Sequence, residues 1–157
     1  MRAHLALLLA VTLAPAPVRA TFEVEGFRQG MERTQAESLA VHKGFSVSQI
    51  DDSNIHICKS KDYCYTLAFC MDHLHFLAYN VDGGTAAFAR IAEQNLAKFG
   101  QPNAWASTDV GQSGPVAQIK LSFYAASHVE SVSLINFRGF DAVSISFTTP
   151  TECPRHR

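Results

Sequence analysis

The sequence has no cluster of lysine or arginine residues, and beyond its N-terminal segment it has no apolar run long enough to span a bilayer. Arg2 and Arg19 belong to the N-terminal segment, and the rest of the chain has 11 basic residues against 14 acidic residues, a formal charge of −3. A weakly acidic chain without basic patches gives no indication of binding to nucleic acid or to an anionic membrane surface.

Several motifs that carry chemistry are also missing. There is no G-x-S-x-G element, the turn that exposes the serine of an α/β-hydrolase. There is no C-x2-C pair, which argues against a zinc site. Gly83-Gly84 precedes a predicted helix, but no lysine or fuller phosphate-binding motif follows, so the pair is interpreted as a turn. No pair of acidic residues stands out for acid–base work, and these absences disfavour catalysis.

Residues 1–20 have the composition of a secretory signal peptide. Arg2 gives a positive start, a short apolar run follows, and cleavage is expected between Ala20 and Thr21. No cysteine lies near that bond, which disfavours a lipoprotein anchor. We therefore expect a periplasmic or secreted protein whose mature part, residues 21–157, is a single domain.

All four cysteines lie in the mature part, and an even count behind a signal peptide indicates two disulfides. Cys64 and Cys70 share one predicted strand, where they would lie roughly 20 Å apart, so they cannot bond to each other. Among the remaining connectivities we predict Cys58–Cys64 and Cys70–Cys153. A cysteine nucleophile is not expected if all four are paired.

The middle of the chain, residues 55–81, is predicted to form three antiparallel strands, because apolar side chains occupy alternate positions. Direct pairing of Cys58 with Cys64 across the first turn puts both cysteines on one face and the apolar pairs on the other. A second turn is expected at Asp72-His73, since both residue types tolerate the left-handed region.

Two helices flank these strands. A capping box of Thr34 and Glu37 predicts a helix that ends at Lys43. Apolar residues at helical spacing predict a second helix from Thr85 to Phe99. Further strands are expected at 45–48, 104–110, 116–125, 128–137 (with a bulge near Leu134) and 143–148.

The predicted order is α-β-β-β-β-α-β-β-β-β. It contains two copies of one unit, in which a helix, a glycine stop and a meander follow one another, with Gly44 and Gly100 as the matched points. The predicted fold class is therefore α+β: an antiparallel sheet of two meanders with two helices packed on one face.

Five residues are candidates for a functional site. His73 and His75 form an H-x-H pair, a spacing that suits metal ligands, although the turn assigned to His73 spoils the geometry and no metal is expected. Tyr79, Trp105 and Tyr124 are expected on the sheet face away from the helices, where exposed aromatic residues mark binding surfaces. The alternative for these aromatics is that they cover the disulfides or fill the edges of the core.

The motif Gly30-Met31, the helix at 34–44 and the segment Phe99-Gly100-Gln101-Pro102 resemble the repeated helix–glycine–meander plan of small periplasmic proteins. This plan is shared by the β-lactamase-inhibitor-like fold and by outer-membrane-assembly lipoproteins of the SmpA/OmlA type. The resemblance implies a binding or inhibitory module. The cysteine positions do not map onto either family, there is no lipid-anchor cysteine, and no functional residue is carried over.

The leading hypothesis is an exported, non-enzymatic binding or inhibitor-like module for a protein or cell-envelope partner, with no cofactor. Its sign would be a contiguous exposed apolar patch on the open sheet face. The alternatives are a small periplasmic hydrolase or metal-binding protein, and a purely structural envelope component. The sequence gives neither the identity of a partner nor the oligomeric state.

Overall fold

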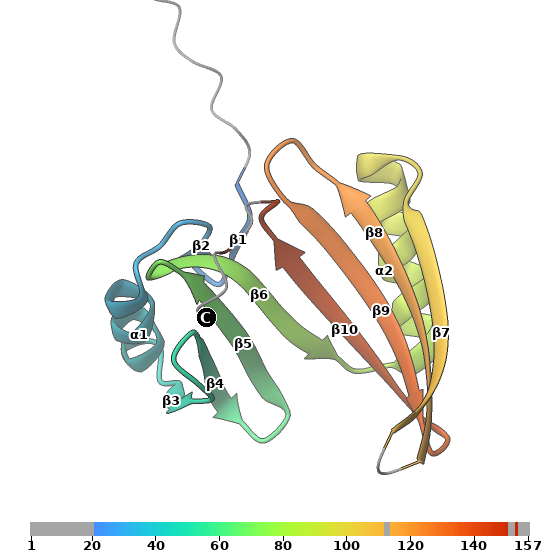
Figure 1. Ribbon diagram of the computed structural model, residues 1–157, viewed down its shortest axis with the longest axis horizontal. Coiled ribbons are helices and arrows are strands. Elements are labelled where there is room, and N and C mark those ends of the chain that lie inside the picture. The colour runs from blue at the N-terminus through green and yellow to red at the C-terminus, as the bar shows by residue number, and fades with distance from the viewer. Residues whose placement is uncertain (1–20, 112–113, 151–152, 154–157) are drawn as a thin grey trace, which may run out of the picture.

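The computed structural model describes residues 21–111, 114–150 and 153 (Figure 1). The predicted signal peptide lies outside these ranges. The elements in chain order are β1 (Glu23–Val24), β2 (Phe27–Arg28), α1 (Arg33–His42), β3 (Ser46–Gln49), β4 (Asn54–Ser60), β5 (Tyr63–Cys70), β6 (His73–Val81), α2 (Gly84–Phe99), β7 (Asn103–Gly111), β8 (Gly114–Tyr124), β9 (Val129–Phe137) and β10 (Phe140–Thr148).

Eight strands form one antiparallel sheet in the order β3-β4-β5-β6-β10-β9-β8-β7, and β1 and β2 form a separate hairpin. Each half of the sheet is a meander preceded by a helix, and the halves join because β6 pairs with β10. The last strand of each unit thus lies at the centre of the sheet, and the first strand of each lies at an edge. The predicted α+β class and element order are confirmed, with the β1–β2 hairpin added before α1.

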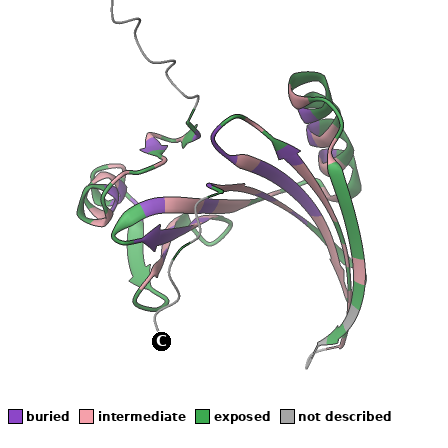
Figure 2. Ribbon diagram, turned by 45° about the horizontal axis from the view of Figure 1, so that its top comes forward, coloured by how far each residue is buried: buried purple, intermediate pink, exposed green. Residues whose placement is uncertain are grey.

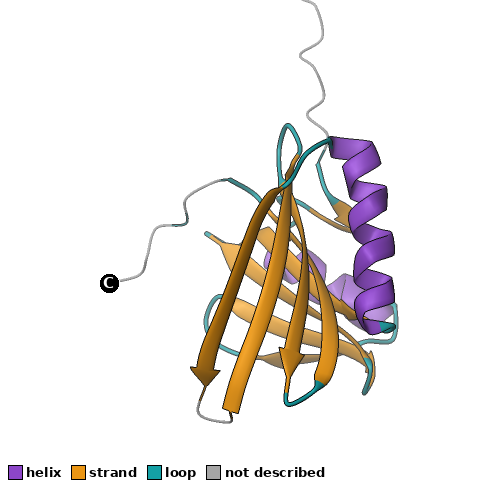
Figure 3. Cartoon of the chain, turned by 90° about the vertical axis from the view of Figure 1, so that its right-hand side faces the viewer, coloured by secondary structure: helices purple, strands orange, loops and turns teal. Residues whose placement is uncertain are grey.

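Both helices pack on the same face of the sheet. Tyr79 and Phe147 contact the apolar cluster under α1 and also the cluster under α2. Tyr79 is paired with Ile145 on the neighbouring strand, and directly paired residues share a face. Figure 2 shows the buried residues concentrated in the central strands, and Figure 3 shows α2 along one side of the second meander. We call the opposite side of the sheet the open face.

Helix α1 begins at Arg33, and its N-cap residue makes no side-chain cap bond. The predicted capping box is therefore wrong, because Thr34 lies inside the helix and the Glu37 carboxylate accepts a bond from the Arg33 guanidinium instead (2.9 Å). A tertiary contact sets the start: the backbone N–H of Arg33 donates to the carbonyl of Asp72 in the β5–β6 turn (2.9 Å). Local cap signals do not contain that contact.

The β5–β6 turn lies one residue earlier than predicted. Met71 and Asp72 occupy its two central positions with φ of 48° and 62°, the left-handed values of a two-residue hairpin. The pairing then shifts by one residue at His75, as a β-bulge requires. Because side chains alternate along a strand, the extra residue places Leu77 and Tyr79 on the helix face.

Helix α2 ends before Gly100, as predicted, and begins one residue before Thr85. Its buried side chains are Ala87, Ile91 and Asn95, one helical turn apart. The Asn95 amide donates to the carboxylate of Glu130 on β9 (2.8 Å), and both residues are more than nine-tenths buried. This bond satisfies polar groups that would otherwise be costly inside the core.

Strand β9 has no bulge, so the one predicted near Leu134 is wrong. Its register is continuous from Val129 to Phe137 with both neighbours, β8 and β10. The mixed hydrophobic pattern has another cause: β9 is central and shielded on both faces. On the open face Ser131 and Ser133 are only 3% and 7% exposed, so that face tolerates small polar and apolar residues alike.

Candidate functional site

Both predicted disulfides are present. Cys58 and Cys64 are directly opposed on β4 and β5, with Cα atoms 4.1 Å apart, and their even positions lie on the open face. Cys70 at the end of β5 is bonded to Cys153, 83 residues later in the chain. No free cysteine remains among the described residues, which include all four. Such pairing is typical of proteins from oxidising compartments.

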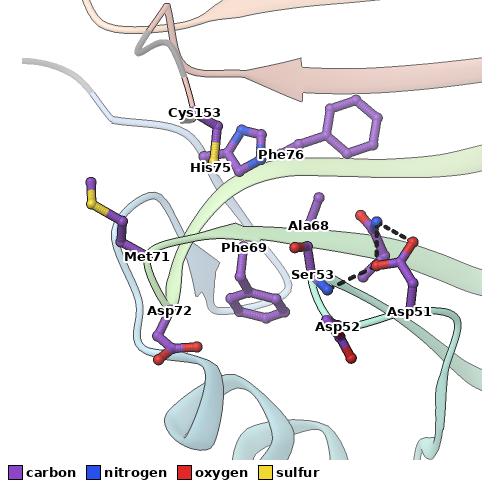
Figure 4. A pocket seen from close by; sticks show the side chains of 11 residues that line it. Asp51, Asp52, Ser53, Ala68, Phe69, Met71, Asp72, His75, Phe76 and Cys153 are labelled. Carbon is purple, nitrogen blue, oxygen red and sulfur yellow. Dashed lines mark hydrogen bonds between the residues drawn. The ribbon is translucent and has the colours of Figure 1, made fainter. Parts of the chain in front are cut away.

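A pocket of about 770 Å³ lies beside the Cys70–Cys153 disulfide at the end of β5 (Figure 4). Figure 4 shows the imidazole of His75 next to Cys153. The other lining residues divide into an apolar wall and an acidic or polar rim. They are Ala68, Phe69, Met71 and Phe76 for the wall, and Asp51, Asp52, Ser53, Asn54 and Asp72 for the rim.

The polar groups of this pocket mainly serve the local structure. The Asp51 carboxylate accepts bonds from the Asn54 amide and from the backbone N–H of Ser53 (both 2.8 Å), and these bonds lower its pKa. Burial lowers the pKa of His75, which favours the neutral imidazole. Cys153 is not a nucleophile in this state because its sulfur is in a disulfide.

His73 and His75 do not form a metal centre with neighbouring ligands among the described residues. Nδ1 of His73 lies 3.1 Å from the carbonyl oxygen of Gly30, whereas His75 follows in the bulge and lines the pocket. The group of metal-ligating side chains that comes together in the described chain is different: His56, Cys58 and Cys64. The sequence contains its signal, since His56 and Cys58 are two residues apart on a strand and so share a face.

The three candidate aromatics do not form one surface. Tyr79 is on the helix face, where burial and the nearby Glu130 raise its pKa, so its assignment to the open face is wrong. The bulge in β6 is the reason. Phe123 lies in the cluster under α2, so its neighbour Tyr124 lies on the open face. Lys120 is three residues from Phe123 and therefore also lies on the open face, which its partner Trp105 shares. Trp105 and Tyr124 are 53% and 60% exposed.

Among the described strands, β7 is an edge of the sheet, with β8 as its neighbour. Of its seven residues with described burial, six are exposed and Ser107 is half-buried, and Figure 2 shows this exposure along the strand. Trp105 projects from the open face, and Val110, 81% exposed, projects from the other. The opposite edge strand, β3, has 4 residues against 9 in β7.

An apolar patch adjoins the far end of this edge on the open face. Val116, Phe137 and Phe140 are paired in series across β8, β9 and β10, and Phe140 is 79% exposed. The sequence alone does not predict the patch, since its members come from three strands and the sheet register alone brings them together. The available signal was an aromatic residue on each side of the Arg138-Gly139 turn.

The chain was compared with protein-family models, with curated proteins and with solved structures, and no significant match was found. The resemblance to the helix–glycine–meander proteins therefore stays a prediction. In the described residues no helix has both the length and the apolar character needed to cross a membrane.

Proposed function

We propose that this protein is an exported, non-enzymatic binding module and that its β7 edge takes up an extended segment of a partner protein from the periplasm or extracellular space. The observation that carries the proposal is the exposure of β7 along its length, at the end of an eight-stranded sheet. An edge strand presents unpaired N–H and C=O groups on its outer side, and another strand satisfies them by pairing.

The side chains of β7 support strand addition. Proteins commonly protect free edges with lysine, proline, bulges or very short strands. Strand β7 contains no lysine or proline and runs in continuous register with β8 from Asn103 to Gly111. At about 3.3 Å per residue it offers an edge of roughly 30 Å. Trp105 on one side and Val110 on the other supply apolar contacts for the alternating side chains of an added strand.

The apolar patch of Val116, Phe137 and Phe140 extends this surface beyond the backbone edge. The patch lies on the open face at the end of β7 where Val110 is also exposed. Phe140 is the exposed member of the patch, whereas Val116 and Phe137 are half-buried, and exposed aromatic side chains carry much of the binding energy in protein interfaces. On the open face the proposal is thus supported by Phe140 in addition to Trp105.

The test is an affinity purification of partners from the organism's own envelope extract, with the exported chain as bait and its disulfides intact. The edge variant Ala106→Lys places a charge on β7 and should lower recovery of a stoichiometric partner at least about tenfold. The matched control Gln49→Lys places the same charge on β3 and should leave recovery unchanged. Each variant is first checked for the wild-type melting temperature.

Two results would contradict the proposal. One is a partner retained equally by Ala106→Lys and by Gln49→Lys. The other is a wild-type protein that forms a dimer which Ala106→Lys converts to a monomer, because the edge would then be occupied by a second copy of the chain. Analytical ultracentrifugation of the three proteins distinguishes this second case.

A further inference from the structure

Three metal-ligating side chains converge on the open face of the β4–β5 hairpin. A ring nitrogen of His56 and the Sγ atoms of Cys58 and Cys64 all lie within 4.8 Å of one another. Both ring nitrogens of His56 are 3.8 Å from Cys58 Sγ. All three residues are half-buried, so the cluster is reachable from solvent.

The hairpin holds these residues in place independently of the bond between the sulfurs. On the helix face, the pairs Ile57–Tyr65 and Ile55–Leu67 follow the cysteine pair in register toward the middle of the sheet, and each of these four side chains is at most 3% exposed. Burial of such side chains stabilises the strand pairing. Opening the Cys58–Cys64 bond therefore leaves its two cysteines facing each other.

We propose that the reduced Cys58–Cys64 pair, together with His56, is a binding site for a thiophilic d10 metal ion, Cu(I) or Zn(II). Reduction supplies two electrons and two protons to the disulfide. With a trialkylphosphine and water as reductant, the S–S bond breaks, two thiols form and the phosphine becomes a phosphine oxide. On metal binding the thiols release their protons as thiolates, and the imidazole binds in its neutral form.

The donor set selects this class of metal. Thiolates favour Cu(I) and Zn(II) over the hard cations Mg²⁺ and Ca²⁺, and imidazole suits both. Three protein ligands complete a trigonal Cu(I) site, whereas Zn(II) would take a fourth, exogenous ligand. A cavity of about 380 Å³, lined by His56, Lys61 and Cys64 among others, has room for such a ligand.

The site is separate from the proposed partner surface. The hairpin belongs to the first meander, and β7 is the outermost strand of the second, with four strands between β5 and β7 in the sheet order. Failure of one proposal therefore leaves the other unaffected.

The test measures metal affinity of the reduced chain under anaerobic conditions. The protein is reduced with a phosphine, freed of it by gel filtration, and titrated with Cu(I) against bathocuproine disulfonate and, separately, with Zn(II) against a chromophoric chelator. Four further samples are compared: the oxidised wild type, Cys58→Ala/Cys64→Ala, His56→Gln and the matched control His42→Gln, whose histidine is exposed on α1. Circular dichroism verifies that each reduced sample is folded.

We expect the reduced wild type and His42→Gln to bind one metal equivalent more than the cysteine double variant, whose Cys70 and Cys153 are reduced as well, and we expect none on the oxidised protein. His56→Gln should bind at least about tenfold more weakly, because a ligand is lost. Tight binding of either metal in this pattern supports the site, and the metal with the higher affinity is the ion that the site prefers. Equal binding by the reduced wild type and the cysteine double variant would overturn the proposal, as would equal binding by His56→Gln and His42→Gln.

Discussion

The two disulfides should contribute unequally to stability, and the lengths of the loops that they close give the size of each contribution. In the chain-entropy model a cross-link stabilises by restricting the unfolded chain, by an amount that grows with the length of the loop it closes. With a sequence separation of 6, Cys58–Cys64 should contribute about 2 kcal/mol, whereas Cys70–Cys153, with a separation of 83, should contribute about 4.5 kcal/mol. Cys70 is also buried, at 6% exposure, whereas Cys58 and Cys64 are both half-buried.

The assay is equilibrium unfolding in urea of the wild type, Cys58→Ala/Cys64→Ala and Cys70→Ala/Cys153→Ala. Both double variants should unfold at lower urea concentration than the wild type. The variant without Cys70–Cys153 should lose about 2.5 kcal/mol more unfolding free energy than the variant without Cys58–Cys64. The m-value should rise more for the variant without Cys70–Cys153 too, because its unfolded chain is less compact. An equal or larger loss for the hairpin pair would refute the loop-length reasoning.

Two further predictions concern Asn95, which is buried, and His75, which is half-buried. Asn95→Ala removes the amide that binds the buried Glu130 carboxylate and should lower the unfolding free energy by about 2 kcal/mol, whereas exposed Gln94→Ala should change it by less than about 0.5 kcal/mol in the same urea assay. Burial depresses the pKa of His75 in the folded state below its usual 6.5, so the unfolded chain binds a proton first as the pH falls. Stability should therefore be fully present above about pH 6.5 and decline as the pH falls through the folded-state pKa, and His75→Gln should flatten urea midpoints measured between about pH 7 and pH 5. An unchanged pH profile in that variant would contradict the assignment.

Local signals in the sequence were sufficient for most of the fold. Alternation of apolar residues located the strands, and the glycine after each helix located its end, because a left-handed residue there ends the helix in any context. The Cys58–Cys64 pairing followed from the same alternation, since only one register separates the cysteines from the apolar pairs. The fold class, the element order and both disulfides are accordingly confirmed.

The candidate site depended on details that local signals do not contain. A single bulge at His75 reversed the face of Tyr79, although nothing in the letters around His75 distinguishes a bulge from a regular strand. The patch of Val116, Phe137 and Phe140 exists because three separate strands align at one end of the sheet. Such surfaces depend on register over the whole sheet.

The sequence by itself determined which segments become helices and strands and how Cys58 pairs with Cys64, because these depend on the period of the side chains and on short loops. Only the tertiary structure decided that β6 pairs with β10. That pairing joins the two units at their last strands and places β7, the longer of the two edge strands, at the end of the described sheet. Contacts between segments far apart in the chain depend on how two complete apolar surfaces fit, and no local pattern encodes that fit.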